Sequence, residues 1–250
     1  MQPPPVPQIF SPRRRRARWR RACARQRSGQ AADFLYEVMA EEIGDRLGFI
    51  RHEARSGLVI GDPSGRAAGL LAPRIPALTL ASPLTLDEEA VLPQRHDLIA
   101  SLALLDTVND VPGALLHIRR ALTPGGLAIV VLTGAGSLPV LRSVLLDAEP
   151  ERPAARMHPM IDVRAAAALM QRAGFARQVA DHFPLTVRYG SFDRLVADLR
   201  DQGLTGVLAS APPPLGRAAL ARAREAFARL AGPDGKVTET FELIVLTGWG

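Results

Sequence analysis

The feature that most restricts the fold is a regular alternation of short apolar runs with helix-like segments. The runs at 57–61, 77–81, 96–104 and 126–134 are largely apolar, and the stretch NDVPGALLHIRRALTPGG lies between the last two. In that stretch Asp110 and Pro112 suit the start of a helix, and Pro124 with Gly125 ends it. Apolar strands that alternate with helices are typical of a parallel sheet covered on both faces.

The second half of the chain continues the same alternation. Helices are predicted near 163–173, 191–200 and 216–231, a strand region that breaks near Pro184 is predicted at 176–189, and a last strand at 236–249. With no internal repeat and no convincing linker, the pattern predicts one doubly wound α/β domain. A hydrophobic content of 47% is enough for a sizeable core.

An arginine-rich segment precedes this pattern. Residues 13–27 hold nine arginines and no acid, so subtracting these nine charges from the net charge of +6 leaves −3 for the rest of the chain. We expect residues 1–27 to form a proline- and arginine-rich arm and residues 28–250 to form the domain. The arm is either a solvated helix or a patch for RNA, acidic lipid or an acidic protein. A single basic arm, rather than a basic domain surface, argues against nucleic acid.

Cellular location is indicated by two further features. Cys23 is the single cysteine, which excludes an internal disulfide and favours a reducing compartment. No run approaches the ~18 to 20 apolar residues that a membrane-spanning helix needs, and the basic start is not followed by an apolar stretch. The sequence therefore predicts a cytoplasmic protein without a transmembrane segment.

The stretch SGLVIGDPSGRAAGLL reads as strand, glycine turn and helix. In a doubly wound sheet such a turn lies where a ligand approaches the backbone, so Gly61, Asp62 and Gly65 are candidate cofactor-binding residues. A purely structural turn is an equally good interpretation, because Pro63 stands where the middle glycine is expected. The second strand ends without a carboxylate, and the next acids are Asp87, Glu88 and Glu89.

Motifs for other chemistries are absent from the sequence. There is no H-x-x-x-H, C-x-x-C or G-x-S-x-G pattern, and the five histidines lack metal-ligand spacing. The sequence therefore predicts no metal site, and it names no catalytic residue.

Several strings together carry a family resemblance: QIFSPRRRRARWRRA, DFLYEV, DEEAVLP, HDLIASLALLDTVNDVPGALLHIRRALTPGGL, MIDVRAAAALMQRAGF and TFELIVLTGW. In this order the chain resembles the bacterial relatives of mitochondrial complex I assembly factor 5, within the class I S-adenosylmethionine-dependent methyltransferase fold. The resemblance implies a mostly parallel sheet with an antiparallel last strand and S-adenosylmethionine as cofactor. Its implied cofactor-binding residues are Gly61, Asp62, Gly65, Asp87, Glu88, Ser101 and Leu102.

The chain also departs from the family pattern. Val59 stands where the family has an acid, Asp106 and Thr107 replace a His-Trp pair, and Val140 replaces a glutamate. Losing two contacts to charged groups weakens cofactor binding by about two to four powers of ten. Only about fifteen residues separate the second strand from HDLIAS, which predicts that the sheet lacks one edge strand.

The resemblance implies a methyltransferase-like protein with an unknown protein or small-molecule acceptor. A non-catalytic assembly protein of the same fold is one alternative. Hydroxylation of a protein arginine, linked to respiratory-complex assembly, is the other, because the eukaryotic relative is an arginine hydroxylase. In that case a respiratory-complex subunit is the expected partner.

Overall fold

The predicted α/β architecture is confirmed. The structure, a computed structural model, describes residues 6–92, 94–151 and 154–250. Within these residues one six-stranded sheet has the order β2-β1-β3-β4-β6-β5. The strands are β1 (Ser56–Ile60), β2 (Ala77–Ala81), β3 (His96–Leu102), β4 (Leu122–Thr133), β5 (Ala176–Tyr189) and β6 (Val237–Trp249).

The pairing directions match a methyltransferase-like sheet. Strands β2, β1, β3 and β4 are mutually parallel, while β6 is antiparallel to both β4 and β5. Strand β2 is an edge, so within the described residues the expected further edge strand is missing, as the short connection to β3 predicted.

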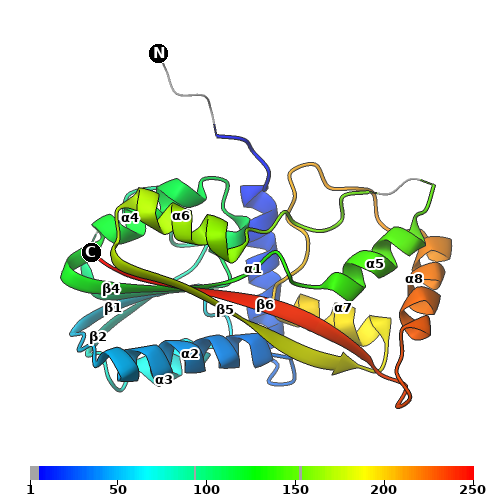
Figure 1. Ribbon diagram of the computed structural model, residues 1–250, viewed down its shortest axis with the longest axis horizontal. Helices are drawn as coiled ribbons and strands as arrows, with labels where there is room; N and C mark the ends of the chain where they lie inside the picture. Colours follow the sequence, from blue (N-terminus) through cyan, green and yellow to red (C-terminus); the bar gives the residue numbers. More distant parts are fainter. Residues whose placement is uncertain (1–5, 93, 152–153) are drawn as a thin grey trace.

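Helices cover both faces of the sheet (Figure 1). On one face lie α2 (Phe34–Ile50) and α3 (Arg66–Leu71), and on the other lie α4 (Val111–Arg120) and α6 (Val163–Ala173). Two buried apolar clusters correspond to these faces. Val59, Leu98 and Ile129 belong to the cluster under α2, and Ile60, Ile99 and Val130 belong to the cluster under α4. The side chains of alternate residues in each strand thus point to opposite faces of the sheet.

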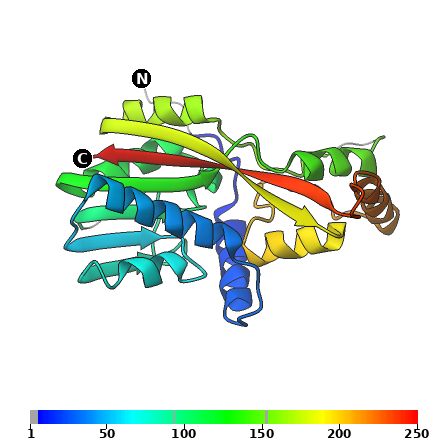
Figure 2. The same cartoon turned by 60° about the horizontal axis from the view of Figure 1, so that its bottom comes forward.

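The β5–β6 pair extends beyond the rest of the sheet (Figure 2). Residues 243–249 of β6 pair with β4, whereas residues 237–242 pair only with β5. Three helices pack around this extension: α5 (Pro139–Ala148), α7 (Phe192–Asp201) and α8 (Arg217–Arg229). Glu239, fully buried in β6, accepts hydrogen bonds from the Val140 and Leu141 amides and so caps α5.

The predicted break near Pro184 is wrong. Strand β5 runs without interruption from Ala176 to Tyr189, and Pro184 is paired with Glu242. Because β5 is an edge strand, a proline in it does not remove a hydrogen bond to a second neighbour.

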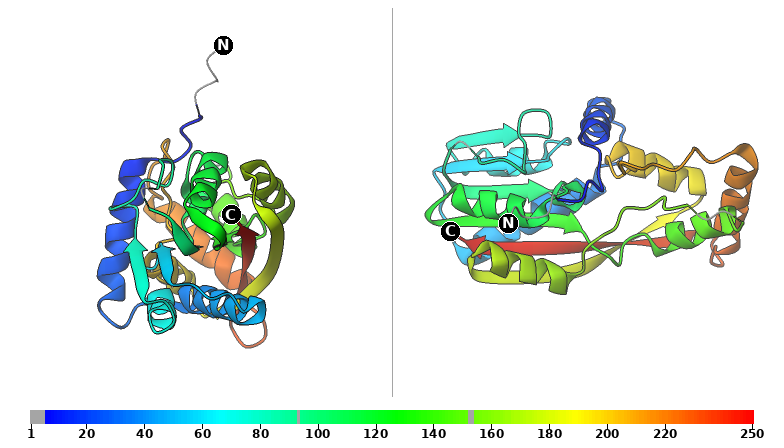
Figure 3. Two further views of the ribbon diagram at one scale, coloured as in Figure 1. Left: turned by 90° about the vertical axis from the view of Figure 1, so that its left-hand side faces the viewer. Right: turned by 90° about the horizontal axis from the view of Figure 1, so that it is seen from above.

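The arginine-rich segment forms α1 (Pro12–Gln26), which stands across the carboxyl ends of the parallel strands (Figures 1 and 3). The Ser11 amide donates to the Val207 carbonyl at 2.9 Å, and at the other end the Arg25 guanidinium pairs with Asp201 at 2.9 Å. One side of the helix is buried, through Arg15, Arg18, Trp19 and Ala22.

The expected solvated arm is therefore wrong for the buried side of α1. Arg13, Arg14 and Arg20 on the other side are exposed, as predicted. Whether residues 28–250 fold as a domain without α1 stays a prediction. Residues 1–5, at the proline-rich start, lie outside the described residues.

Candidate cofactor cleft

The glycine turn follows β1, at the carboxyl ends of the parallel strands. Gly61 has a φ of +91°, and a Cβ at this position would lie 2.4 Å from the Leu102 carbonyl oxygen and 2.6 Å from the Leu104 side chain. Glycine is thus required here because the turn approaches the end of β3 closely. Gly65, with a φ of +78°, is exposed and faces open space.

Asp62 is occupied by its own loop. Its Oδ1 accepts hydrogen bonds from the Ser64 hydroxyl and the Gly65 amide, both at 2.9 Å, and its Oδ2 accepts from the Ala68 amide at 2.8 Å. The carboxylate therefore caps the first turn of α3 and holds the glycine turn in shape. We assign it a structural role in this conformation.

Of the two candidate acids, Asp87 and Glu88, only Glu88 is buried, against α1. It is 4% exposed, and its Oε1 and Oε2 accept from Nη2 and Nη1 of Arg15 at 3.0 and 3.3 Å. Asp87 is exposed and accepts from the Glu89 amide in its own turn. The bidentate pair joins α1 to the segment after β2 and fixes α1 over the end of the sheet.

Ser101 and Leu102 end β3 within the core. Leu102 is fully buried, and its carbonyl is the group that Gly61 approaches. The Ser101 hydroxyl is buried and has no hydrogen-bond partner among the described residues. Gly61, Glu88, Ser101 and Leu102 thus meet at the carboxyl ends of the parallel strands. The Asp62 carboxylate, in contrast, bonds within its own loop, and Asp87 is exposed.

A second group of polar side chains, which the sequence did not indicate, lies beside these strand ends. The Thr107 hydroxyl accepts from Arg15 Nε at 3.2 Å and from Arg18 Nη2 at 3.1 Å, and it donates to the Leu104 carbonyl. Asp106 Oδ2 accepts from the Thr133 hydroxyl at 2.7 Å, while its Oδ1 is buried and has no partner in the described part of the chain. Burial lowers the pKa of Arg18.

The buried residues of α1 follow the spacing of one helix face, at positions i, i+3, i+4 and i+7. Two of these four are arginines, so an apolar stripe was not visible in the sequence. The replacement of the family's His-Trp pair by Asp106 and Thr107 was the available signal, since it introduces a carboxylate and a hydroxyl that arginines can contact.

His158 lies beside the same group and carries a prediction about pH. Its Nε2 accepts from the Val207 amide at 2.8 Å, and burial, followed by the positive charge of Arg18, lowers its pKa to about 4. The ordinary pKa is about 6.5. Between these values the unfolded chain binds a proton that the folded chain does not. The stability that neutral His158 contributes is therefore present above pH 6.5 and lost as the pH falls toward 4, by up to about 3 kcal/mol.

We expect urea unfolding between pH 4 and 7 to show this loss for the native chain. His158→Asn, whose amide oxygen can still accept from Val207, should show a flatter dependence. Equal slopes for the two chains would contradict the assignment.

Comparison with known proteins places the chain in a family. A family model described as a methyltransferase domain matches residues 40–178, which is more than half of the chain. The chain belongs to the methyltransferase domain family.

Several relatives and one solved structure are similar to this chain. The zebrafish protein named arginine-hydroxylase NDUFAF5, mitochondrial, is 30% identical over 65% of this chain and 53% of its own length. The mouse protein of the same name is 27% identical over 95% of this chain and 75% of its own length. The chain therefore spans about half of the first relative. The YcgJ protein of Bacillus subtilis matches at a TM-score of 0.53, with 13% identity over 83% of this chain and 97% of its own, which shows the fold alone.

The family implies S-adenosylmethionine, and the cleft at the ends of β1, β2 and β3 does not accept it in this conformation. Trp19 of α1 belongs to the same buried apolar cluster as Ile60 and Leu104, and the cavity lined by Trp19 and Leu104 is about 10 Å³. Such a volume is about that of one water. Both oxygens of the Glu88 carboxylate already accept hydrogen bonds from Arg15, and the Asp62 carboxylate accepts hydrogen bonds from its own loop.

No group of three or more His, Cys, Asp or Glu side chains among the described residues could hold a metal ion. In the same residues, no helix combines the length and the apolar character needed to cross a membrane.

Proposed function

We propose that this chain is a methyltransferase-family protein that binds S-adenosylmethionine at the ends of β1, β2 and β3, and only after α1 has moved. The observation that carries the proposal is the meeting of Gly61, Glu88, Ser101 and Leu102 at these strand ends. In open α/β sheets, ligands bind beyond the carboxyl ends of the strands. When bound, S-adenosylmethionine supplies an activated methyl group, and the acceptor is a protein or small molecule of unknown identity.

The residues of the cleft have distinct parts in this proposal. Once freed from Arg15, the Glu88 carboxylate is the acceptor for a donor group of the cofactor, and the Ser101 hydroxyl is an unused polar group at the same strand ends. The Gly61 turn and the Asp62 cap hold the backbone in place and are unchanged by the opening. Helix α1 excludes both water and ligand until it moves.

Closure by α1 makes binding weak, because part of the binding free energy is spent on displacing the helix. The apparent affinity falls by the fraction of molecules in which the cleft is open. Binding is also weakened by the loss of family acids at Val59 and Val140. We therefore expect S-adenosylmethionine or its demethylated product to bind the full chain only at high ligand concentration.

The test uses Trp19 as a reporter of α1. In Trp249→Phe, Trp19 is the only remaining tryptophan, and its buried side chain becomes exposed if α1 leaves. Titration calorimetry should show weak binding, and Trp19 emission should shift to longer wavelength along the same isotherm. Tight binding with unchanged emission would show that α1 is no barrier. No heat of binding and no shift of Trp19 emission at millimolar ligand would contradict the proposal and support the non-catalytic alternative.

A non-catalytic assembly or interaction protein of the same fold is the alternative favoured by the anchoring of α1. The helix is held at both ends, by Ser11 to Val207 and by Arg25 to Asp201, which favours a cleft that stays closed. Hydroxylation of a protein arginine, with a respiratory-complex subunit as partner, is supported only by the relatives' name. We propose the cytoplasm as the compartment, because the single cysteine favours a reducing environment. The relatives' name, in contrast, includes the word mitochondrial.

A further inference from the structure

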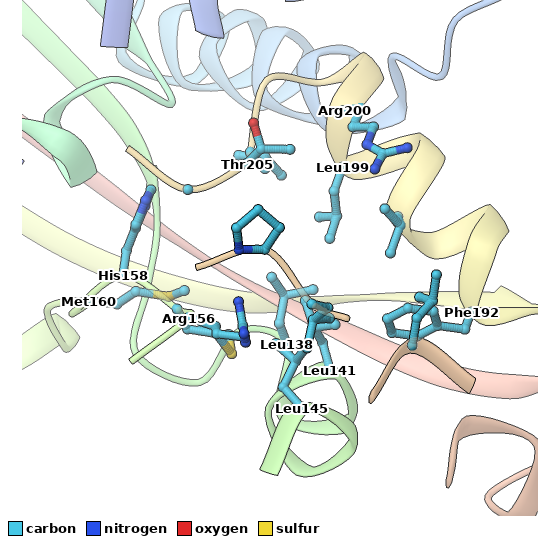
Figure 4. A pocket seen from close by; sticks show the side chains of 17 residues that line it. Leu138, Leu141, Leu145, Arg156, His158, Met160, Phe192, Leu199, Arg200 and Thr205 are labelled. Carbon is cyan, nitrogen blue, oxygen red and sulfur yellow. The ribbon is translucent and has the colours of Figure 1, made fainter. Parts of the chain in front are cut away.

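A separate cavity lies between α5, α7 and the segment that follows α7 (Figure 4). Its volume is about 480 Å³, within the range of pockets that hold small molecules. It is formed by the extension of the β5–β6 pair beyond β4, so it lies away from the turn at Gly61. The cavity shares His158 with the polar group beside the cofactor cleft, but Gly61, Glu88, Ser101 and Leu102 do not line it.

The wall of the cavity consists of two apolar helix faces. Along α5 the contributing side chains are spaced by three and four residues, and the same holds along α7, so each helix presents one face. These six side chains are Leu138, Leu141, Leu145, Phe192, Val196 and Leu199. A tail of methylene groups is the kind of ligand that such a wall binds, because burying it removes apolar surface of both partners from water.

The polar lining of the cavity is cationic. Among the described residues that line it there is no Asp or Glu, whereas Arg156 and Arg200 are present. The Arg156 guanidinium is already committed: Nε and Nη2 pair with Glu149, and Nη1 donates to the Pro213 carbonyl. Three of the five N–H groups of Arg156 are thus used, and Glu149 compensates its charge, so Arg156 attracts an anionic ligand less than an unpaired arginine does.

Arg200 differs from Arg156 in this respect. Its side chain is exposed and makes no ion pair or hydrogen bond with another described residue, and it lies at the end of α7 beside the cavity (Figure 4). His158, also in the lining, is neutral at pH 7, since its pKa is about 4. Arg200 is thus the charge that selects a ligand at this cavity.

We propose that this cavity binds a single-chain amphiphile with a carboxylate head, whose tail lies between α5 and α7 and whose head pairs with Arg200. This inference goes beyond the proposed function and does not depend on cofactor binding. It explains a preformed apolar cavity of this size beside a cation without a partner. An Arg–carboxylate pair is favoured by planar, two-point hydrogen bonding.

The experiment compares three ligands with the same tail, dodecanoate, dodecanol and dodecylamine, each titrated into the full chain below its micelle concentration. We expect dodecanoate to bind best and protonated dodecylamine at least about tenfold more weakly, since a charge-assisted hydrogen bond corresponds to about tenfold or more. Equal binding of the amine, or no binding of dodecanoate, would overturn the proposal.

Two variants locate the ligand. Arg200→Gln should weaken dodecanoate by up to about fivefold, as expected for a pair with an exposed arginine, and should leave dodecanol unchanged, because only the charge is removed. The matched control is Arg194→Gln on the same helix, whose guanidinium pairs with Asp198 and does not line the cavity. Equal losses in the two variants would indicate unspecific attraction to a basic surface and would refute the site.

Filling the cavity should weaken all ligands together. Val196→Trp places a large ring in the space for the tail, and Leu145→Trp does so from the opposite wall, so either variant suffices if the other fails to fold. Both side chains are only half-buried, which makes the exchange tolerable. Undiminished dodecanoate binding in a folded variant, judged by its melting temperature, would place the ligand elsewhere.

Discussion

Arg15→Met is expected to lower the free energy of unfolding by about 3 to 5 kcal/mol, the cost of leaving one partner of a buried ion pair behind. Arg15 is 9% exposed and Glu88 4% exposed, and the two are joined by a bidentate contact. Methionine matches the length of the arginine stem, so packing against α1 is largely kept. What is lost is the charge that compensates Glu88, together with the bond from Nε to Thr107.

Urea unfolding measures the effect, and two further variants separate its causes. Arg13→Met alters an exposed arginine of the same helix and should change stability by less than about 0.5 kcal/mol. Arg15→Met combined with Glu88→Met removes both charges and should recover most of the loss, since replacing a buried pair by apolar groups is often neutral. If Arg15→Met lowered the free energy of unfolding no more than Arg13→Met does, α1 would not pack as described, and the interpretation of α1 as a solvated arm would be correct.

The alternation of strands and helices could be predicted because it rests on local patterns. Apolar runs such as 57–61 and 126–134 have few other ways to be buried, and Asp110 and Asp162 are recognisable caps that accept from the Gly113 and Ala165 amides. The missing edge strand was predictable from a count of residues. The break at Pro184 was not real, because the sequence does not show that β5 is an edge strand.

The cleft could be predicted only in part. The turn pattern predicted Gly61. The structure shows, however, that glycine is needed there because the backbone lies close to the Leu102 carbonyl, and not because a ligand approaches. The role of Glu88 depends on Arg15, which lies 73 residues away, and no local pattern records that contact. Arginines on the buried face of a helix also look like a solvated face until their acceptors, Glu88 and Thr107, are placed.

Val59→Asp is expected to destabilise the fold by roughly 3 to 5 kcal/mol and to bring no gain in cofactor affinity. The family resemblance implies an acid at the position of Val59, and the substitution introduces the implied residue. In this chain, however, Val59 is 1% exposed and belongs to the apolar cluster under α2. It lies in register with Leu80 of β2 and Ala100 of β3. A carboxylate placed there has no partner.

Charge and polarity can be separated with Val59→Asn, which is similar in size to the aspartate but has no charge. Val59→Asn should be less destabilised than Val59→Asp at pH 7. The difference in stability between the two variants should shrink as the pH falls. Burial raises the pKa of an unpaired carboxylate, and the protonated carboxyl carries no charge. Melting temperature and S-adenosylmethionine titration are measured on both variants. A stable Val59→Asp chain that binds the cofactor more tightly would mean that the end of β1 still opens onto a polar pocket. Lower stability with unchanged affinity would mean that the Gly61 turn serves the packing of β1 against β3, and that no polar pocket opens at Val59.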